Sequence, residues 1–445
     1  MSPQAKTFIK DIGAGLILRR SSPEDAEALS AFCADIHSDD PEKPDPIIGA
    51  WTKDLLTRPH PRFHPDDFTI VEETATGRIV STLNLIPQTW SYDGIPFEVG
   101  RPELVGTAPE YRNRGLVRLQ FEEIHRWSEQ RGDLVQGITG IPFYYRLFGY
   151  EMAVDLDGAR SGFAMHVPQL PTGQSEPCKF RLATEADIPV ITALYQDGYR
   201  RYPLACIRDE AIWRYELRER DPLVAHPTVM IESSEGQVLG VFRHWPQVGK
   251  RRGISVNMYE LKPGVSWLDI TPAVIRYVWN IGQQCAAEQQ RPCSAFTFEL
   301  ADSHPVYQMF RERLPEVHQP YAWYLRVSDL PRFLRHVAPA LEQRLAQSPA
   351  CGHTGQVRVS FYRSGLRLGF ERGRLVTIEP WHPGPKEQEG DIAFAGLTFL
   401  QVLFGYRSLD ELHASFADCW WSSNEVRALF DALFPKKPSQ VLCLS

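Results

Sequence analysis

The stretch "LVGTAPEYRNRGLVRLQFEEIHRW", residues 104–127, joins a strand-like segment to a helix-like segment. Three arginines, Arg112, Arg114 and Arg118, surround Gly115 at the junction, and apolar side chains at helical spacing follow it. Bare amides at a helix start, close to positive charge, form an arrangement that binds phosphate groups. The alternative is a solvated basic turn. The order of strand, glycine and helix favours the phosphate site.

The bulk composition is typical of folded domains and excludes some partners. A chain of 445 residues predicts about three domains at ~150 residues each. The formal net charge of −7 argues against nucleic acid as a partner, since a nucleic-acid binder is usually basic, and is compatible with a cationic substrate. The eight cysteines include no C-x-x-C pair, so the sequence predicts neither a metal site nor a disulfide framework.

The sequence contains no apolar run long enough to cross a membrane. The longest, residues 392–405, is too short and contains Thr398 and Gln401. The N-terminal stretch lacks the apolar core of a signal peptide. We therefore expect a cytoplasmic protein without a membrane partner.

Two parts of the chain repeat the same pattern. "LRRSSPEDAEALSAF" (residues 18–32) aligns without gaps with "FRLATEADIPVITAL" (residues 180–194). Downstream, residues 68–88 and 227–247 both predict hairpins with glycine at the turn. "PFYYRLF" from Pro142 has a counterpart in "PVYQMF" from Pro305. Three matches in the same order indicate a duplicated α/β fold with mixed sheets.

The predicted domains are residues 1–167, 178–325 and 326–445. A polar, proline-rich linker separates the two copies, and the last range shows a helix followed by alternating strands, which predicts an α+β domain. The copies differ at the basic turn, because the second has Lys262 as the only nearby cation. Only the first copy is therefore expected to bind an anion there.

"VGTAPEYRNRGLV" resembles the signature of the GCN5-related N-acetyltransferases (GNAT), a strand followed by Arg/Gln-x-x-Gly-x-Gly/Ala. Arg112, Gly115 and Val117 occupy the three signature positions, and Val117 departs from the usual small residue. "YYRLFGYE" resembles the later segment that carries the general acid, which makes Tyr145 the candidate acid. The tail resembles a sterol-carrier-protein domain. The order of two GNAT copies and that tail resembles acetyltransferases of the enhanced-intracellular-survival type.

The resemblance implies acetyl-CoA as cosubstrate and no metal. Backbone amides at the end of the motif strand would bind the pantetheine arm and the thioester carbonyl, and the basic turn would hold the pyrophosphate. The expected acetyl-CoA-binding residues are Val105, Gly106, Thr107, Arg112, Asn113, Arg114, Gly115, Leu116, Val117, Arg118, Gly140 and Ile141.

The catalytic candidates are an acid and two rival bases. A phenol suits the acid role of Tyr145, because its reference pKa (~10) lies above that of a thiol (~8.5); the alternative is packing among neighbouring aromatic side chains. The resemblance implies that the terminal carboxylate, here on Ser445, accepts the proton. Glu103 is the rival base, and its alternative reading is a buried partner of Arg101.

The predicted function is acetyl transfer from acetyl-CoA to a primary amine. The family's acceptors include aminoglycosides and lysine side chains, and the sequence does not choose between these and other cationic amines. The resemblance also implies a homo-oligomer and suggests a hexamer. Two other classes stay open: a lipid carrier acting through residues 326–445, and an acyl-CoA sensor without turnover.

Overall fold

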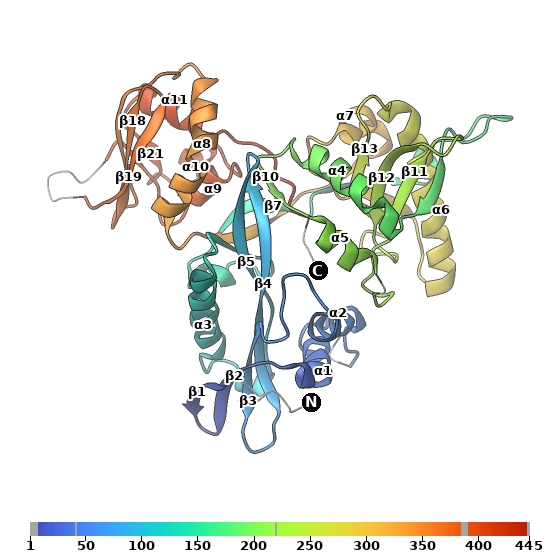
Figure 1. Ribbon diagram of the computed structural model, residues 1–445, viewed down its shortest axis with the longest axis horizontal. Coiled ribbons are helices and arrows are strands. Elements are labelled where there is room, and N and C mark those ends of the chain that lie inside the picture. The colour runs from blue at the N-terminus through green and yellow to red at the C-terminus, as the bar shows by residue number, and fades with distance from the viewer. Residues whose placement is uncertain (1–7, 41, 219, 384–389, 443–445) are drawn as a thin grey trace.

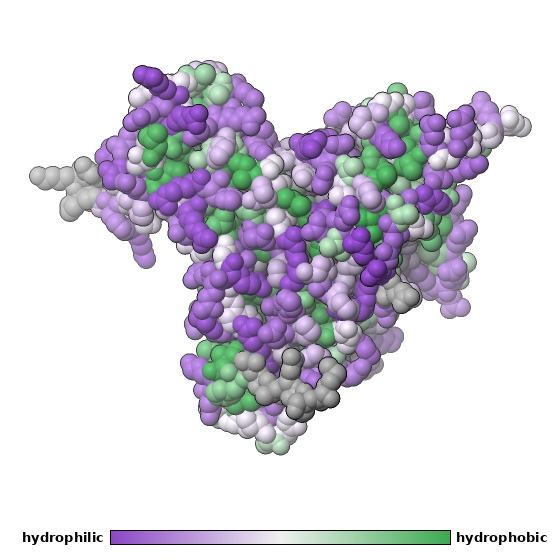
Figure 2. Space-filling view, viewed as in Figure 1, coloured by the Kyte–Doolittle hydropathy of each residue, from purple (hydrophilic) through white to green (hydrophobic). Residues whose placement is uncertain are grey.

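The computed structural model describes residues 8–40, 42–218, 220–383 and 390–442, which form three lobes around a central junction (Figure 1). Each lobe is built on its own sheet, so the fold is α/β with mixed sheets, as expected. Hydrophilic residues cover most of the face seen in Figure 2, and apolar residues there lie in separate patches.

The first lobe holds a nine-stranded sheet covered by helices on both faces. The strand order is β1-β2-β3-β4-β5-β6-β16-β7, with β10 added against β4. The strands are β1 (Phe8–Gly13), β2 (Leu16–Arg20), β3 (Phe68–Glu73), β4 (Ile79–Tyr92), β5 (Ile95–Thr107), β6 (Val135–Ile138), β16 (Tyr321–Arg326), β7 (Glu151–Leu156) and β10 (Leu204–Cys206). The helices are α1 (Ala26–Ile36), α2 (Pro46–Thr57) and α3 (Leu116–Arg131), and a 3-10 turn, η3 (Tyr144–Phe148), precedes β7.

The second lobe repeats this plan with a seven-stranded sheet, in the order β15-β8-β14-β13-β12-β11-β9. Its strands are β15 (Glu316–His318), β8 (Ala159–Phe163), β14 (Ala295–Phe298), β13 (Gly253–Leu261), β12 (Val238–His244), β11 (Thr228–Glu232) and β9 (Lys179–Leu182). Its helices are α4 (Ile188–Tyr199), α5 (Glu210–Leu217), α6 (Trp267–Gln289) and α7 (Pro305–Met309).

The same ion-pair network marks the repeat in both lobes. Arg19 makes two hydrogen bonds to Asp25, at 2.8 and 2.7 Å, and a third from Nε to Glu72 at 2.7 Å. Arg181 makes two to Asp187, both at 2.7 Å, and a third to Glu232 at 2.8 Å. Each aspartate lies just before a helix. The two stretches aligned in the sequence therefore form equivalent structures.

The two sheets exchange strands. β8 follows β7 in the chain but lies in the second sheet, between β14 and β15. β16 follows the second sheet in the chain but lies in the first, between β6 and β7. Two strands thus cross the predicted boundaries, and the ranges 1–167, 178–325 and 326–445 remain a proposal.

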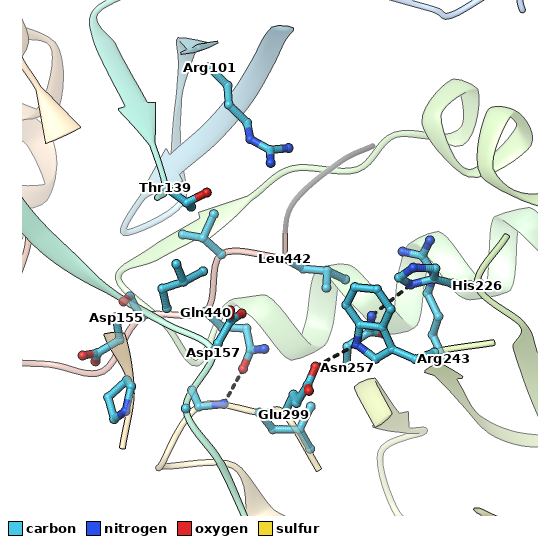
Figure 3. Close-up of a pocket in the computed structure, with 18 of the residues that line it drawn as sticks. Arg101, Thr139, Asp155, Asp157, His226, Arg243, Asn257, Glu299, Gln440 and Leu442 are labelled. Carbon is cyan, nitrogen blue, oxygen red and sulfur yellow. Dashed lines mark hydrogen bonds between the residues drawn. The ribbon is translucent and has the colours of Figure 1, made fainter. Parts of the chain in front are cut away.

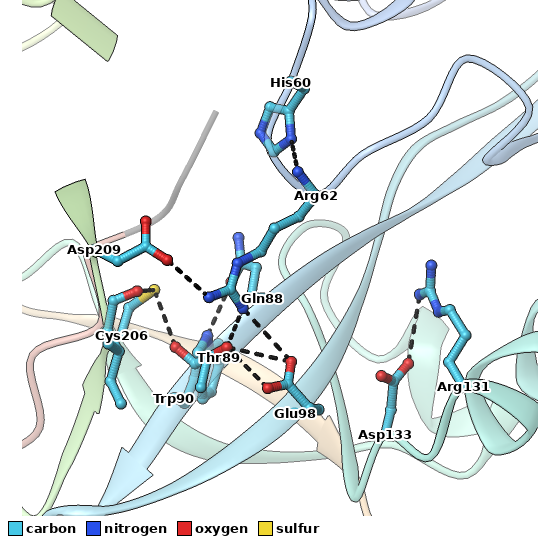
Figure 4. A network of polar contacts seen from close by, with 11 residues as sticks. His60, Arg62, Gln88, Thr89, Trp90, Glu98, Arg131, Asp133, Cys206 and Asp209 are labelled. Atoms are coloured by element: carbon cyan, nitrogen blue, oxygen red, sulfur yellow. Dashed lines mark hydrogen bonds and ion pairs between the residues drawn. The ribbon is translucent and has the colours of Figure 1, made fainter. Parts of the chain in front are cut away.

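The ribbon formed by β4 and β5 reaches from the first lobe to the junction of all three (Figure 1). Near its tip, the hydroxyl of Tyr92 donates to the carbonyl of Leu403, and Arg344 pairs with Asp93 at 2.6 Å. On its other edge, β10 from the second lobe pairs with β4. Figure 4 shows Arg62, from the loop after α2, reaching across this edge to Asp209 at 3.1 Å. The ribbon therefore fixes the second and third lobes relative to the first.

The third lobe holds a five-stranded sheet, in the order β19-β18-β17-β20-β21, packed against helices. Side chains from both layers, including Leu334, Leu368, Phe399 and Phe430, are buried in one core. The strands are β17 (Gly355–Ser360), β18 (Gly365–Glu371), β19 (Arg374–Trp381), β20 (Ile392–Ala393) and β21 (Trp420–Trp421). The helices are α8 (Leu330–Ala346), α9 (Phe399–Leu403), α10 (Leu409–Ser415) and α11 (Asn424–Leu433).

Candidate active site

The first sheet parts between β5 and β6. Their parallel ladder joins only Val99 to Val135 and Gly100 to Gln136, although β5 continues to Thr107. On its opposite edge β6 pairs with β16. The last part of β5 is therefore paired with β4 on one edge and separated from β6 on the other, where a substrate's amide groups could bond to it.

A β-bulge lies at this parting. Thr82 on β4 faces Gly106 and Asn84 faces Glu103, so β5 has one residue more than β4 between these pairs. Leu104, within the bulge, has a φ of +53°. Bulges bend a strand and change the direction of its groups. The predicted contacts Val105, Gly106 and Thr107 follow this bend.

Gly106 also has a packing role. A Cβ atom on it would lie 2.4 Å from Cγ2 of Ile36 on α1. Any side chain there would force the side chain of Ile36 to move. The glycine therefore lets α1 lie directly against β5, independently of any contact that its amide makes.

The basic turn forms the N-terminus of α3, as predicted. Asn113 and Gly115 have φ values of +62° and +78°, the left-handed region, and Gly115 is the N-cap. No side chain caps the helix, and the first helical hydrogen bond runs from the amide of Leu119 to the carbonyl of Gly115. The amides of Leu116, Val117 and Arg118 therefore have no partner within the helix and lie at its positive end.

The side chains around this turn leave it open to an anion. Arg112, Arg114 and Arg118 are exposed, and none pairs with a carboxylate among the described residues. Val117, the departure from the signature, packs its side chain against the core cluster around Phe121. Its β-branched side chain thus points toward the protein, so it leaves the amide accessible.

Tyr145 lies in η3, on the far side of the parting from the ribbon. It is 5% exposed and packs edge-on against Phe121, Tyr144 and Tyr324. Burial raises the pKa of its phenol well above the usual range, and the nearby carboxylate of Glu103 adds to the effect. The phenol is therefore a proton donor at neutral pH, as the predicted acid role requires.

The absence of a side chain at Gly140 leaves room for the phenol of Tyr145. Its φ is +130°, and a Cβ atom on it would lie 3.2 Å from the Tyr145 hydroxyl. Gly140 and Ile141 form the loop between β6 and η3, so this predicted pair lies beside the acid. Ile141 is 63% exposed.

Glu103 is held by an ion pair with Arg101. Its Oε1 accepts hydrogen bonds from Nη2 and Nε of Arg101, at 2.7 and 3.0 Å, and contacts the hydroxyl of Thr139 at 3.4 Å. The Arg101 guanidinium lies over the rings of Trp51 and Trp323. Glu103 is therefore a partner of Arg101 in this fold, which is the structural alternative to its role as a base.

A cavity of about 400 Å³ adjoins this ion pair, enclosed by the first lobe, the second lobe and the segment 439–442 (Figure 3). Arg101 and Thr139 line its first-lobe end, and His226, Arg243 and Asn257 line its second-lobe end. Asp155, Asp157, Glu299 and Asp302 supply carboxylates.

Two carboxyl groups in the wall of this cavity have raised pKa values. Asp157 lines the cavity, and partial desolvation there raises its pKa to about 6, with Glu299 adding to the shift. Burial also raises the pKa of Asp155. Glu299 is paired with Arg251, so its charge is largely compensated. Carboxylates in this wall suit a cationic acceptor.

The equivalent parting in the second lobe is closed by its own side chains. The ladder between β13 and β14 ends at Val256 and Phe298. Beyond it, the His304 ring is bonded to the carbonyl of Tyr259 at 2.9 Å, and the Tyr307 hydroxyl donates to the carbonyl of Phe298 at 2.5 Å and accepts from the amide of Leu300 at 3.1 Å. These bonds occupy backbone groups at the parting of the second lobe.

The second helix start also differs from the first. Ser266 caps α6 by accepting from the amide of Asp269, and Asp269 adds a negative charge in the first turn. An anion is disfavoured beside this carboxylate. Together with the closed parting, this capping distinguishes the second copy from the first.

The end of the described chain returns to the cavity. Gln440 bonds to the carbonyl of Leu204 through its amide and to the amide of Ala301 through its side chain. Val441 and Leu442 line the cavity. Ser445, the predicted proton acceptor, lies outside the described residues.

Comparison with known families identifies the first lobe. Residues 37–153 match the model of the acetyltransferase (GNAT) domain. This range includes the parted strand, the basic turn and Tyr145. These residues therefore form a GNAT-type acetyltransferase domain. Acetyl-CoA is the cosubstrate that this fold implies.

Solved structures share the fold over nearly the whole chain. A probable N-acyltransferase from Enterococcus faecalis V583 is 12% identical with a TM-score of 0.65, over 97% of this chain and 100% of that one. A GCN5-related N-acetyltransferase from Kribbella flavida is 16% identical with a TM-score of 0.63, over 97% and 98%. Eis1 from Mycobacterium abscessus is 13% identical with a TM-score of 0.59, over 97% and 99%.

Other comparisons and searches are negative. No curated protein matches the sequence. Within the described ranges, no group of three or more histidine, cysteine, aspartate or glutamate side chains could hold a metal ion. No described helix combines the length and apolar character needed to cross a membrane.

Sequence reasoning missed the residues that surround the acceptor cavity. Trp51, Thr139, Asp155, Asp157 and Glu299 come from separate segments and form no motif. It also missed Tyr324, whose ring contacts Tyr145.

Charge reversal of Arg112 and Arg114 together to glutamate is expected to weaken CoA binding by about 10- to 100-fold, or about 1.4–2.8 kcal/mol. The physical reason is repulsion of the diphosphate at the start of α3. Isothermal titration with CoA measures the effect.

Lys262→Glu, at the equivalent turn of the second lobe, is the matched control and should leave CoA affinity unchanged. Equal losses in both variants would contradict a site confined to the first lobe.

Proposed function

We propose that this chain transfers the acetyl group of acetyl-CoA to a primary amine held in the cavity between the first two lobes. The observation that carries the proposal is the parting of β5 from β6. It connects the uncapped start of α3 with Tyr145, and the acidic cavity lies beside it.

Each part of the site has a defined task. The amides at the start of α3 and the adjacent arginines bind the diphosphate, and the amides at the end of β5 bind the pantetheine arm and polarise the thioester carbonyl. Tyr145 donates its proton to the departing thiolate. The acetyl–sulfur bond breaks as the acetyl–nitrogen bond forms.

Two groups remain candidates to accept the amine proton. Glu103 lies beside the cavity, but its Oε1 already accepts two hydrogen bonds from Arg101. The carboxylate of Ser445 is the other candidate, and the approach of residues 439–442 to the cavity supports it. We propose the Ser445 carboxylate as the acceptor, with Glu103 as its rival.

The acceptor class follows from the charge of the cavity. Asp155, Asp157 and Asp302 attract a protonated amine, and Trp51 and Trp245 offer apolar surfaces for its carbon frame. An aminoglycoside, a lysine side chain and another cationic amine all have this chemistry. The proposed assembly is a homo-oligomer, by resemblance to the family's hexamer.

The lipid-carrier alternative finds less support. The sheet of the third lobe buries its apolar side chains, such as Leu368, against its own helices. An acyl-CoA sensor would bind CoA equally well, and turnover separates it from an enzyme.

Tyr145→Phe is expected to lower turnover by about 100-fold or more while CoA affinity stays within twofold, because only the proton donor is removed. Acetyl-CoA consumption with a panel of primary amines measures turnover. Tyr144→Phe is the control and should retain activity. Unchanged turnover in Tyr145→Phe would remove the acid assignment, and turnover by no amine in wild type would favour the sensor.

Glu103→Gln and a chain extended beyond Ser445 are expected to differ. If Ser445 accepts the proton, the extension lowers kcat strongly, and Glu103→Gln lowers it less. The same assay, with CoA binding as the control, compares them. If the extended protein is active and the Glu103→Gln variant is inactive, Glu103 is the proton acceptor and Ser445 is not.

Acceptor binding is expected to weaken as the pH falls through about 6. Asp157 is charged above its raised pKa of about 6 and neutral below it, so attraction for a cationic amine is lost on acidification. The KM for the amine, measured between pH 5 and 8, should rise severalfold at the acidic end. Asp157→Asn should show the high KM throughout this range, and an unchanged pH profile in this variant would contradict the assignment.

A further inference from the structure

Tyr324 touches the loop that carries Tyr145, although 179 residues of chain separate the two. It lies on β16, the strand that enters the first sheet from beyond the second lobe. There it pairs with Ile138 on one side and Met152 on the other. A register shift between Trp323 and Tyr324 changes the direction of this part of the strand.

The Tyr324 side chain is fully buried, and its hydroxyl is hydrogen-bonded. Its hydroxyl accepts a hydrogen bond from the amide of Phe143 at 2.6 Å and faces the carbonyl of Ile141 at 3.5 Å. Its ring lies edge-on to the ring of Tyr145, with centroids 5.6 Å apart. The residue thus contacts both the acid and the loop before it.

This loop needs such support because its backbone is strained. Gly140 has a φ of +130°, and Phe143 has a φ of +70°, which is unfavourable for a residue with a side chain. Conformations of this kind persist only where the surroundings hold them. Phe143 is the N-cap of η3, and its side chain is 62% exposed. Its own side chain is therefore poorly anchored, and the bond to Tyr324 holds its amide.

We propose that Tyr324 is a positioning residue for the general acid, supplied to the first lobe by the strand that follows the second copy. The inference depends on the proposed acid role of Tyr145. Tyr324 holds the N-cap of η3, and Tyr145 is the second residue of this turn. A shift of the phenol by about 1 Å is enough to cost on the order of 100-fold in rate.

The inference gives the second copy a part in catalysis without a binding site of its own. The second copy precedes β16 in the chain, and the exchange of strands between the sheets puts β16 between β6 and β7. β7 pairs with no strand other than β16 among the described residues. The acid loop is therefore held between strands whose order depends on the second lobe.

The test uses the full-length protein with Tyr324→Phe, which removes the hydroxyl and keeps the ring. We expect kcat to fall by about 10- to 100-fold, with the KM for acetyl-CoA and the affinity for CoA within twofold. The diphosphate site at α3 makes no contact with Tyr324, so binding is the readout that should not move.

Tyr307→Phe is the matched control. Tyr307 is also buried, and its hydroxyl bonds to two backbone groups, in the second lobe. It should lower the thermal midpoint to a similar extent and leave kcat within twofold. Parallel losses of kcat and thermal midpoint in both variants would overturn the inference, and so would a Tyr324→Phe variant with kcat within twofold of wild type.

Tyr145→Phe and the double variant separate this inference from the proposed function. If Tyr324 acts through Tyr145, Tyr324→Phe causes no further loss in the Tyr145→Phe background. A further loss of tenfold would overturn positioning, because Tyr324 would then act independently. An active Tyr145→Phe variant would overturn the acid role itself, whereas an inactive one beside an active Tyr324→Phe variant would overturn only the positioning role.

Discussion

The proposed site of this protein depends on one interruption of a β-ladder, where β5 leaves β6 after two residue pairs. A parted sheet exposes backbone donors and acceptors that must be satisfied by water, by side chains or by a ligand. The second lobe satisfies groups at the equivalent place with His304 and Tyr307. In the first lobe, the same geometry opens toward an uncapped helix start and an acidic cavity. The same duplicated fold therefore gives one closed copy and one open copy.

The other lobes act on this opening through the long ribbon of β4 and β5. The second lobe adds β10 to one edge of the ribbon, and the third lobe binds its tip through Arg344 and Leu403. The acceptor cavity is formed where these contacts bring the first lobe, the second lobe and the segment 439–442 together. The proposed substrate site is thus a property of the assembled chain, while the proposed diphosphate site belongs to the first lobe alone.

Local sequence patterns predicted the repeat, the hairpins, the glycine turn before α3 and the place of Tyr145, because each depends on neighbouring residues. Strand exchange could not be predicted in this way. The pairing of Tyr324 with Ile138 joins segments far apart in the chain, and a local sequence pattern does not name the partner of a strand. The Arg101–Glu103 pair was visible from sequence spacing, but its neighbours Trp51 and Trp323 were not. The acceptor cavity left no pattern for the same reason, since its walls come from every part of the chain.

The exchange of β8 and β16 also sets an order of events during synthesis. β7 cannot join the first sheet until the chain has been made as far as Arg326, since β16 is the strand with which β7 pairs. Until then the nascent N-terminal part of the chain holds an unfinished edge, a form prone to wrong pairing. The first sheet is therefore completed only after the second portion of the chain has been made.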